Sequence, residues 1–174
     1  MKTILWFLAF VSLCACHSED KKTVFHETYT GPLLELDSVN TLLSDSAKMK
    51  MRIIAPKQFE FVNGDRTFPN GLKIVFYKGN GKQDAVLTSK SGKYNKLKDL
   101  FTATGNVIIQ NEAEKKKLTT EELNWSPKDK KVFTNKFVVI QTPTEILKGE
   151  GLEAPQDFST YKILKVTGIF SVNK

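Results

Sequence analysis

The sequence predicts an all-β domain of antiparallel strands that follows an N-terminal export signal. Apolar and polar residues alternate with a period of two along most of the chain, which is typical of strands with one buried face. Turn residues, mainly Gly, Asn, Asp and Pro, separate these segments at short intervals. Short antiparallel strands without helices close either as a barrel or as two packed or splayed sheets in a jelly roll.

The first residues have the layout of a secretory signal. Lys2 supplies a positive charge, residues 4–11 are an unbroken apolar run, and a small residue precedes Cys16. The run is well short of the roughly 20 residues that a transmembrane helix needs. Leu13-Cys14-Ala15-Cys16 matches the bacterial lipobox, so we expect residues 1–15 to be removed and Cys16 to be lipidated. A secretory signal that merely contains cysteines is the alternative.

The only two cysteines therefore serve export rather than redox chemistry. After processing, Cys14 is lost and the Cys16 thiol becomes a thioether, so no free thiol or disulfide remains. Lipid chains contribute about 0.8 kcal/mol per buried methylene, and more than one chain gives stable membrane attachment. Residues 16–30 are polar, contain both histidines, and are predicted to form a flexible tether. Residues 31–174 are predicted to form the folded domain.

The residue types of the domain argue against catalysis and against a metal site. Histidine and cysteine are the commonest general bases and nucleophiles, and both histidines, His17 and His26, lie in the tether. Metal binding by imidazole or thiolate is excluded for the same reason. We therefore expect no enzymatic activity, no metal and no cofactor. The remaining carboxylates are scattered among lysines without a spacing that suggests acid–base chemistry: Asp84, Asp99, Glu112, Glu121, Glu122 and Asp157.

The chain is basic, with 26 Lys and Arg against 19 Asp and Glu and a net charge of +7. Removal of residues 1–15 takes away Lys2 and no acid, which leaves +6. A positive balance often indicates nucleic acid, but export across the membrane argues against that partner. An anionic lipid surface or a phosphorylated lipid suits a lysine-rich, tethered domain better. Lysines that keep strand edges soluble are the simpler explanation for most of them.

The domain begins with its one candidate helix, over residues 33–43, where leucine and valine recur. Asp, Ser, Asn and Thr between them lower helix propensity, so we favour a strand over residues 39–43 with a turn at residues 44–46. Residues 48–55 alternate between polar and apolar side chains and predict the next strand, which Pro56 is expected to end.

Two further strands are each closed by a turn signature. Residues 59–62 end at Asn63-Gly64-Asp65, and residues 71–77 end at Gly79-Asn80-Gly81.

Four segments after these strands resemble one another. Each begins with an apolar residue and threonine and ends on a large apolar residue or tyrosine, and their starts are 14, 17 and 15 residues apart. Each unit is about one strand and one turn, so the chain is predicted to cross a sheet repeatedly in similar fashion. Chance similarity of threonine-rich strands is the alternative. Turns are expected at residues 111–116 and 127–130. The units are "LTSKSGKY" from Leu87, "FTATGNVI" from Phe101, "LTTEELNW" from Leu118 and "FTNKFVVI" from Phe133.

Apolar side chains in these strands are numerous enough to form an inner face. They are spread over a long succession of strands, which suits a lined groove as well as a dense core. The candidate groove residues are Ile74, Phe76, Val107, Ile109, Leu123, Trp125, Val138 and Ile140.

The order of several motifs resembles the LptC family of periplasmic lipopolysaccharide-export proteins, in the lipoprotein form of Bacteroidetes. The resemblance spans residues 31–172 and is joined to a lipobox. The motifs are "SDSAKMKMRIIAPK", "FPNGLKIVFY", "ATGNVIIQNEAEKKKLTTEELNW", "KVFTNKFVVI" and "LKGEGLEAPQDFSTYKI".

This resemblance implies a twisted, open and elongated β-jelly roll of the OstA/LptA type. It implies that the domain accepts lipopolysaccharide from an inner-membrane ABC transporter and hands it to a periplasmic LptA-like jelly roll, with the acyl chains between splayed sheets. The protein would then be periplasmic and lipid-anchored at the inner membrane. The unpaired edges of an open jelly roll would join neighbouring domains by strand addition. We expect either "TNKFVVI" or "YKILKVTGIF" to lie at a docking edge, although an interior position suits each equally.

Two other functions stay open. A non-enzymatic periplasmic or surface lipoprotein that binds glycan or protein would have a densely filled core and ligand contacts in exposed turns, such as residues 79–81 or 127–131. An acyl-modifying enzyme would depend on one of the carboxylates.

Overall fold

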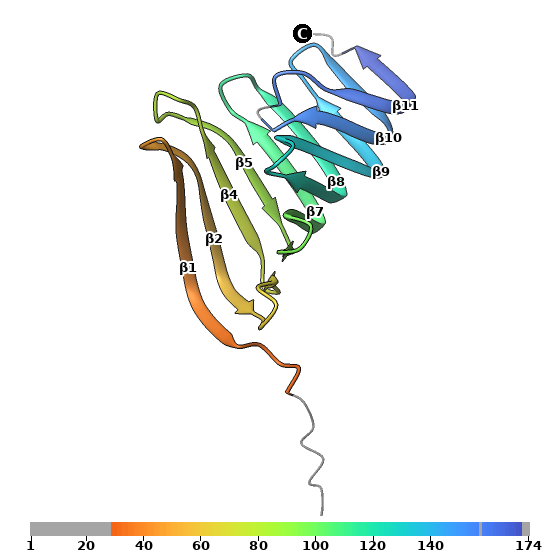
Figure 1. Ribbon diagram of the computed structural model, residues 1–174. Coiled ribbons are helices and arrows are strands. Elements are labelled where there is room, and N and C mark those ends of the chain that lie inside the picture. Colours follow the sequence, from red (N-terminus) through yellow and green to blue (C-terminus); the bar gives the residue numbers. More distant parts are fainter. Residues whose placement is uncertain (1–28, 157, 172–174) are drawn as a thin grey trace, which may run out of the picture. The chain divides into compact units, whose positions relative to one another are not determined.

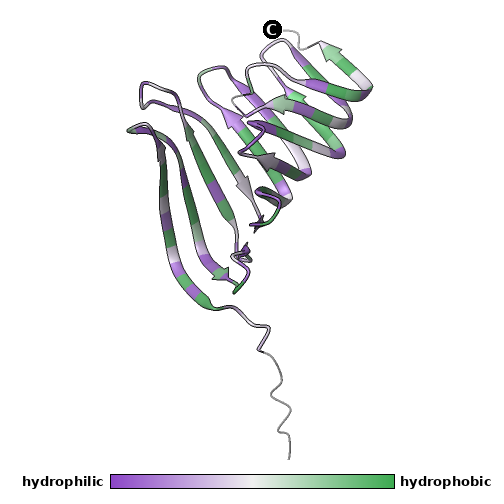
Figure 2. Cartoon of the chain, in the orientation of Figure 1, coloured by the Kyte–Doolittle hydropathy of each residue, from purple (hydrophilic) through white to green (hydrophobic). Residues whose placement is uncertain are grey.

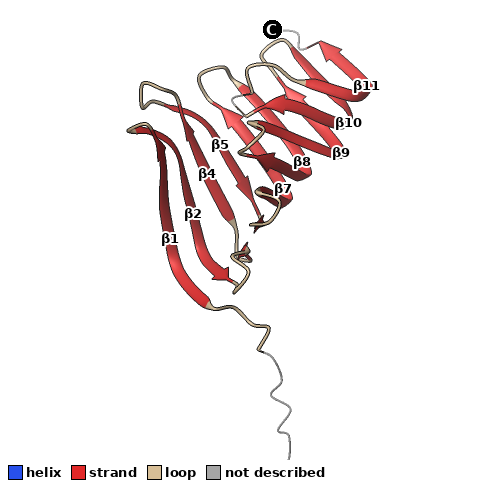
Figure 3. Cartoon of the chain, viewed as in Figure 1, coloured by secondary structure: helices blue, strands red, loops and turns tan. Residues whose placement is uncertain are grey.

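Eleven β-strands joined by turns make up the part of the chain that the structure describes (Figures 1 and 3). This computed structural model describes residues 29–156 and 158–171, and no helix occurs among them. The chain divides into two units, Met1–Thr30 and Gly31–Lys174, and all strands belong to the second. The all-β prediction is confirmed. The strands are β1 (Leu34–Asp45), β2 (Lys48–Glu60), β3 (Arg66–Phe68), β4 (Leu72–Tyr77), β5 (Gln83–Ser89), β6 (Ser91–Asn95), β7 (Leu100–Asn111), β8 (Lys116–Ser126), β9 (Lys131–Gln141), β10 (Glu145–Pro155) and β11 (Lys162–Ser171).

The strands form one antiparallel sheet in which each pass lies beside the next pass in the sequence. The order is β11-β10-β9-β8-β7-β5-β4-β2-β3-β6, with β1 paired to β2 and β6 also paired to β7. β3 and β4 are two halves of one pass, because both pair with β2; likewise β5 and β6 both pair with β7. β1 and β11 remain as edges, so the sheet does not close into a barrel.

The longer passes are interrupted near their middle by irregularities that bend the sheet. A β-bulge places two residues opposite one and bends the strand. Lys90 interrupts the pass formed by β5 and β6. Its N–H donates to the Gly105 carbonyl at 2.9 Å, so this interruption lies beside the bend in β7. In β7 the register against β8 shifts between Thr104 and Val107, and in β8 the register against β9 shifts between Thr120 and Asn124. In β10 the register shifts between Glu150 and Leu152 against β9, and between Lys148 and Gly149 against β11.

The bends give the sheet two layers with the apolar core between them. Gly105 (φ 80°) and Asn106 (φ 46°) form the bend in β7, and both residue types tolerate this left-handed backbone. The first layer comprises β1, β2, β4, β5 and residues 107–111, 116–120, 138–141 and 145–149. The second layer comprises β3, β6 and residues 100–104, 123–126, 131–134 and 152–155. Apolar and polar residues alternate along the passes (Figure 2), so one face of each layer is apolar.

Residues 33–43 form no helix, because β1 pairs with β2 over its whole length from Leu34 to Asp45. The preference for a strand in this region is confirmed, and the strand is longer than predicted. The predicted turns at residues 63–65, 79–81, 111–116 and 127–130 also join strands as expected. At the first of these, the Asn63 side-chain oxygen accepts a hydrogen bond from the Asp65 N–H at 3.0 Å.

The expectation that Pro56 ends its strand is wrong, since β2 continues to Glu60. Pairing with β4 stops at Ile54 and pairing with β3 starts at Phe59, so Pro56 lies where β2 has a partner on one side only. Its missing N–H costs least at such a place. On the β1 side the residue opposite is Ser38, whose φ of 56° already interrupts the ladder.

Gly149 is required by the close approach of β10 and β11 at their bend. A Cβ atom there would lie 2.3 Å from the Lys165 carbonyl oxygen and 2.5 Å from Cγ2 of Ile163. We expect Gly149→Ala to lower the free energy of unfolding in urea by roughly 1–3 kcal/mol, because the backbone of β11 must move. Gly79→Ala is the control, since nothing lies within 4 Å of its Cβ position. Equal effects of the two substitutions would contradict this account of the bend.

Candidate functional site

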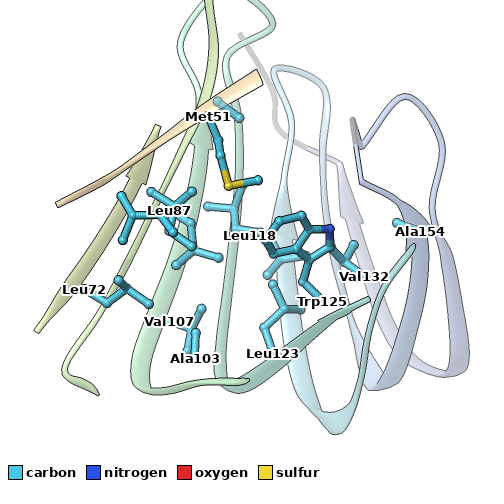
Figure 4. Packing of buried hydrophobic residues seen from close by; sticks show 14 of the residues in the cluster. Met51, Leu72, Leu87, Ala103, Val107, Leu118, Leu123, Trp125, Val132 and Ala154 are labelled. Atoms are coloured by element: carbon cyan, nitrogen blue, oxygen red, sulfur yellow. The ribbon is translucent and has the colours of Figure 1, made fainter. Parts of the chain in front are cut away.

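The apolar faces of the two layers bring all eight predicted groove residues together. Seven of them are at most 6% exposed, and Phe76 is partly buried against them. They come from four strands, β4, β7, β8 and β9, and all point to the space between the layers. Figure 4 shows Val107, Leu123 and Trp125 in this cluster with side chains of neighbouring strands.

The first layer carries a continuous aliphatic row at right angles to its strands. Directly opposed residues on neighbouring strands have Cβ atoms roughly 4.5–5.5 Å apart, so each side chain in the row contacts the next. We call the row and the face opposite it the trough. The row consists of the cross-strand pairs Ile53–Ile74, Ile74–Leu87, Leu87–Ile109, Ile109–Leu118, Leu118–Ile140, Ile140–Leu147 and Leu147–Ile169.

The second layer faces this row with a shorter row of four residues, which we call the aromatic row after its first two members. Phe101, Trp125, Val132 and Ala154 are successive cross-strand partners. The Phe101 and Trp125 rings stack with centroids 4.9 Å apart, and Phe76 of the first layer meets Trp125 edge-on at 6.2 Å. These are the favoured aromatic geometries. The trough is therefore lined by apolar side chains on both sides.

The middle of the trough is closely packed. Two small cavities of about 30 and about 10 Å³ remain there, and each has room for about one water molecule or less. Apolar side chains alone line the smaller cavity, whereas Asn111, Glu114, Lys116 and Lys117 contribute to the wall of the larger one. The predicted groove residues thus form a packed interior in this structure.

A larger cavity of about 690 Å³ opens at the strand ends, and we call it the vestibule. Its volume is in the range of small-molecule sites. Its apolar wall comes from Leu43, Met51, Phe76 and Trp125, and three lysines, Lys50, Lys78 and Lys130, stand at its rim. Lys78 pairs with Asp84 at 3.2 Å. The surroundings thus combine an apolar wall with charged groups, which suits an amphiphile.

Four of the carboxylates considered in the sequence make local hydrogen bonds through their side chains: Asp84, Asp99, Glu112 and Glu121. Asp84 accepts a hydrogen bond from the Asn111 amide at 3.1 Å, and Asp99 accepts one from the Tyr94 hydroxyl at 3.0 Å. In residues 29–156 and 158–171, no group of three or more His, Cys, Asp or Glu is placed to hold a metal ion. The same residues include no helix long and apolar enough to cross a membrane.

Both edges of the sheet expose apolar side chains of the trough face. On β1 these are Leu34, Leu36 and Leu43, and on β11 they are Val166 and Ile169. "YKILKVTGIF" forms the edge strand β11, whereas "TNKFVVI" lies in β9 between β8 and β10. Only the former segment can add a strand in the folded sheet.

Two aromatic residues outside the predicted set also reach the trough. Phe158 and Tyr161, in the connection between β10 and β11, pack against the core. Their surroundings in the sequence are polar and show no alternation, so the only signal is the aromatic side chains themselves. The predicted lipidation site Cys16, the signal and the histidines lie outside the described residues, as does Asp157.

Comparison with known proteins identifies one family. The family model described as "Lipopolysaccharide-assembly, LptC-related" matches residues 8–170, nearly the whole chain. No curated protein matches the sequence.

Burial at the trough raises the pKa of the Tyr161 hydroxyl above its ordinary value of 10.0, with nearby Glu145 adding to the effect and Lys116 opposing it. The folded state therefore holds this proton more tightly than the unfolded chain does. Its contribution to stability is present below the unfolded pKa and is lost as the pH rises through the folded pKa.

We expect Tyr161→Phe to reduce the loss of stability between about pH 9 and about pH 11. The measurement is the free energy of unfolding in urea at each pH for the variant and the natural chain. Parallel curves for the two proteins would show that the Tyr161 hydroxyl is not buried in the fold.

Proposed function

Because the chain belongs to the LptC family, we propose that it accepts lipopolysaccharide from the inner-membrane ABC transporter and passes it along the trough to an LptA-like jelly-roll protein. Membership of the family implies involvement in lipopolysaccharide export, in the periplasm and in association with the inner membrane. The hand-off, the route and the residues are the proposal.

The observation that carries the proposal is the aliphatic row that crosses the first layer from β2 to β11. Each acyl methylene left in water costs about 0.8 kcal/mol, so a lipid with several chains needs an apolar surface throughout its path. Contacts along such a row are non-directional, and a chain can slide from one strand to the next without breaking hydrogen bonds. No catalytic residue is required.

The close packing of the middle of the trough sets a condition on this function. An acyl chain does not fit into cavities of about 30 and about 10 Å³, so the two layers must separate, or core side chains must move, when lipid enters. Irregular residues at the bends, such as Gly105 and Asn106, allow the angle between the layers to change with less strain than straight strands would.

Anchoring and docking complete the proposal. A lipid on Cys16 would hold the domain beside the membrane from which cargo is extracted, with residues 16–30 as the tether. β11 offers an unpaired edge for strand addition by the next jelly roll, and β1 offers one for a domain on the transporter side. The apolar residues exposed at both edges would then line a trough that continues into the neighbours.

The alternative function is a non-enzymatic lipoprotein that binds glycan or protein. The closely packed interior favours it, because such a module needs no internal path.

A photo-crosslinking residue on the trough face separates these functions. We expect lipopolysaccharide adducts in cells with the crosslinker at Val107, Ile109, Leu123, Trp125, Val138 or Ile140, detected by immunoblot with anti-lipopolysaccharide serum. Ile108 and Val139 are matched controls, since they point to the other face of the same strands. Adducts at no trough position would reject the transport path and leave the binding module.

The edge β11 is tested by capture of protein. With the crosslinker at Leu164 or Phe170, about half exposed on β11, we expect covalent capture of a periplasmic jelly-roll protein, identified by mass spectrometry. Phe137 is equally exposed but belongs to the interior strand β9, so it should capture none. Equal capture at all three positions would indicate non-specific hydrophobic contact instead of strand addition.

A further inference from the structure

Phe158 lies beside the vestibule, because Gln156 and Ser159 on either side of it line that cavity. Its own side chain lines both small cavities. Residues of the first layer form most of the wall of one, and residues of both layers form the wall of the other. The vestibule shares Phe76 and Trp125 with the cavity of about 10 Å³ and Glu114 with the cavity of about 30 Å³. The ring of Phe158 therefore lines both of the small cavities that share wall residues with the vestibule.

The backbone at Phe158 is strained. Its φ is 53°, a left-handed value that bulky residues rarely adopt. Such strain persists only where surrounding contacts enforce it, and it is concentrated at binding sites and switches. Here the Phe158 N–H donates to the Pro155 carbonyl at 3.0 Å, and the aromatic ring packs against the core.

The neighbouring Gln156 ties this connection to the vestibule wall. Its N–H donates to the Lys130 carbonyl at 2.9 Å, and its side-chain oxygen accepts a hydrogen bond from Nε1 of Trp125 at 3.3 Å. Trp125 is thus both part of the wall of the trough and a hydrogen-bond partner of Gln156, which lies two residues before Phe158. A ligand that moves Trp125 would also disturb this attachment.

Three lysines and three carboxylates line the vestibule, and each carboxylate has a partner: Asp84 pairs with Lys78, Glu114 pairs with Lys116, and Asp45 accepts a hydrogen bond from the Ser46 hydroxyl. Among the described residues, no carboxylate lies within 4.0 Å of the ammonium group of Lys50 or of Lys130, whereas Lys78 is paired. Both lysines are exposed and line the same cavity as Leu43 and Met51. An anionic headgroup at these lysines would place its acyl chain against that wall.

We propose that the vestibule is the first binding site for an acyl chain of an anionic lipid, and that Phe158 occupies the path of that chain until the lipid displaces it. The inference rests on the proposed function for the identity of the lipid. It adds an entry point at the strand ends and a side chain that keeps the trough closed when empty.

The first test compares neighbouring leucines in cells that make lipopolysaccharide. Leu43 lines the vestibule, whereas Leu42 is exposed on the opposite face of β1. We expect lipopolysaccharide adducts with a photo-crosslinking residue at Leu43 and none at Leu42. Adducts at both positions would indicate adhesion to the surface and overturn the vestibule site.

The second test changes the size of the side chain at Phe158. With the crosslinker at Ile109, deep in the trough, we expect Phe158→Ala to increase the lipopolysaccharide adducts several-fold relative to those at Leu43. Phe158→Leu, which keeps an apolar side chain in the core, should give an intermediate increase and covers the case in which alanine destabilises the fold. Phe137→Ala removes an exposed phenylalanine outside the trough and should change nothing.

The outcomes separate this inference from the proposed function. Adducts at Ile109 without adducts at Leu43 would overturn the vestibule as the entry site and leave the transport path intact. Adducts at Ile109 that do not respond to either Phe158 variant would overturn the role of Phe158. Adducts at neither Ile109, Leu43 nor the other trough positions would overturn both proposals.

Discussion

The structure depends on keeping one apolar face continuous while successive passes bend. A strand alternates its side chains strictly, so a bend with the wrong number of residues would turn half of each pass inside out. In β8 the buried positions change from Leu118 and Thr120 to Leu123 and Trp125 across the register shift. The extra residue at the bend corrects the parity, and both halves present their apolar side chains to the same space. The aliphatic row, the aromatic row and the core between them all follow from this correction.

Much of this arrangement could be predicted from alternation and turn residues alone. The strands, most turns and the shared face of the eight trough residues follow from local patterns. Alternation with a period of two is enough to assign each side chain to one face of its strand. The position of Pro56 inside a strand could not be predicted in this way. Strand β2 tolerates a proline there only because the pairings with β4 and β3 leave that position without a partner on one side. Phe158 could not be identified either, because its position is set by packing between the layers. The close packing of the trough is likewise a property of three-dimensional contacts.

A site that transports a lipid has to bind the lipid and then release it. In the proposed function, the trough would meet this need through many weak apolar contacts, each small and none directional. An empty open trough would expose a large apolar surface to water, and the protein avoids this by packing the layers against each other, with Phe158 against the core. Under the proposed function, closed packing and lipid passage are two states of the same surface. The family to which the chain belongs gives this pair of states its biological setting.

The open edges of the sheet also bear on how such a domain changes over evolutionary time. Each pass contacts mainly the passes beside it, as units do in repeat proteins, whose stability is roughly a sum over units and their junctions. Gain or loss of one hairpin would therefore lengthen or shorten the domain by about 10 Å, twice the spacing between strands, without redesign of the rest. The length of such a domain, and with it the distance that it spans, can in this way be adjusted in discrete steps by duplication or deletion of short segments of coding sequence.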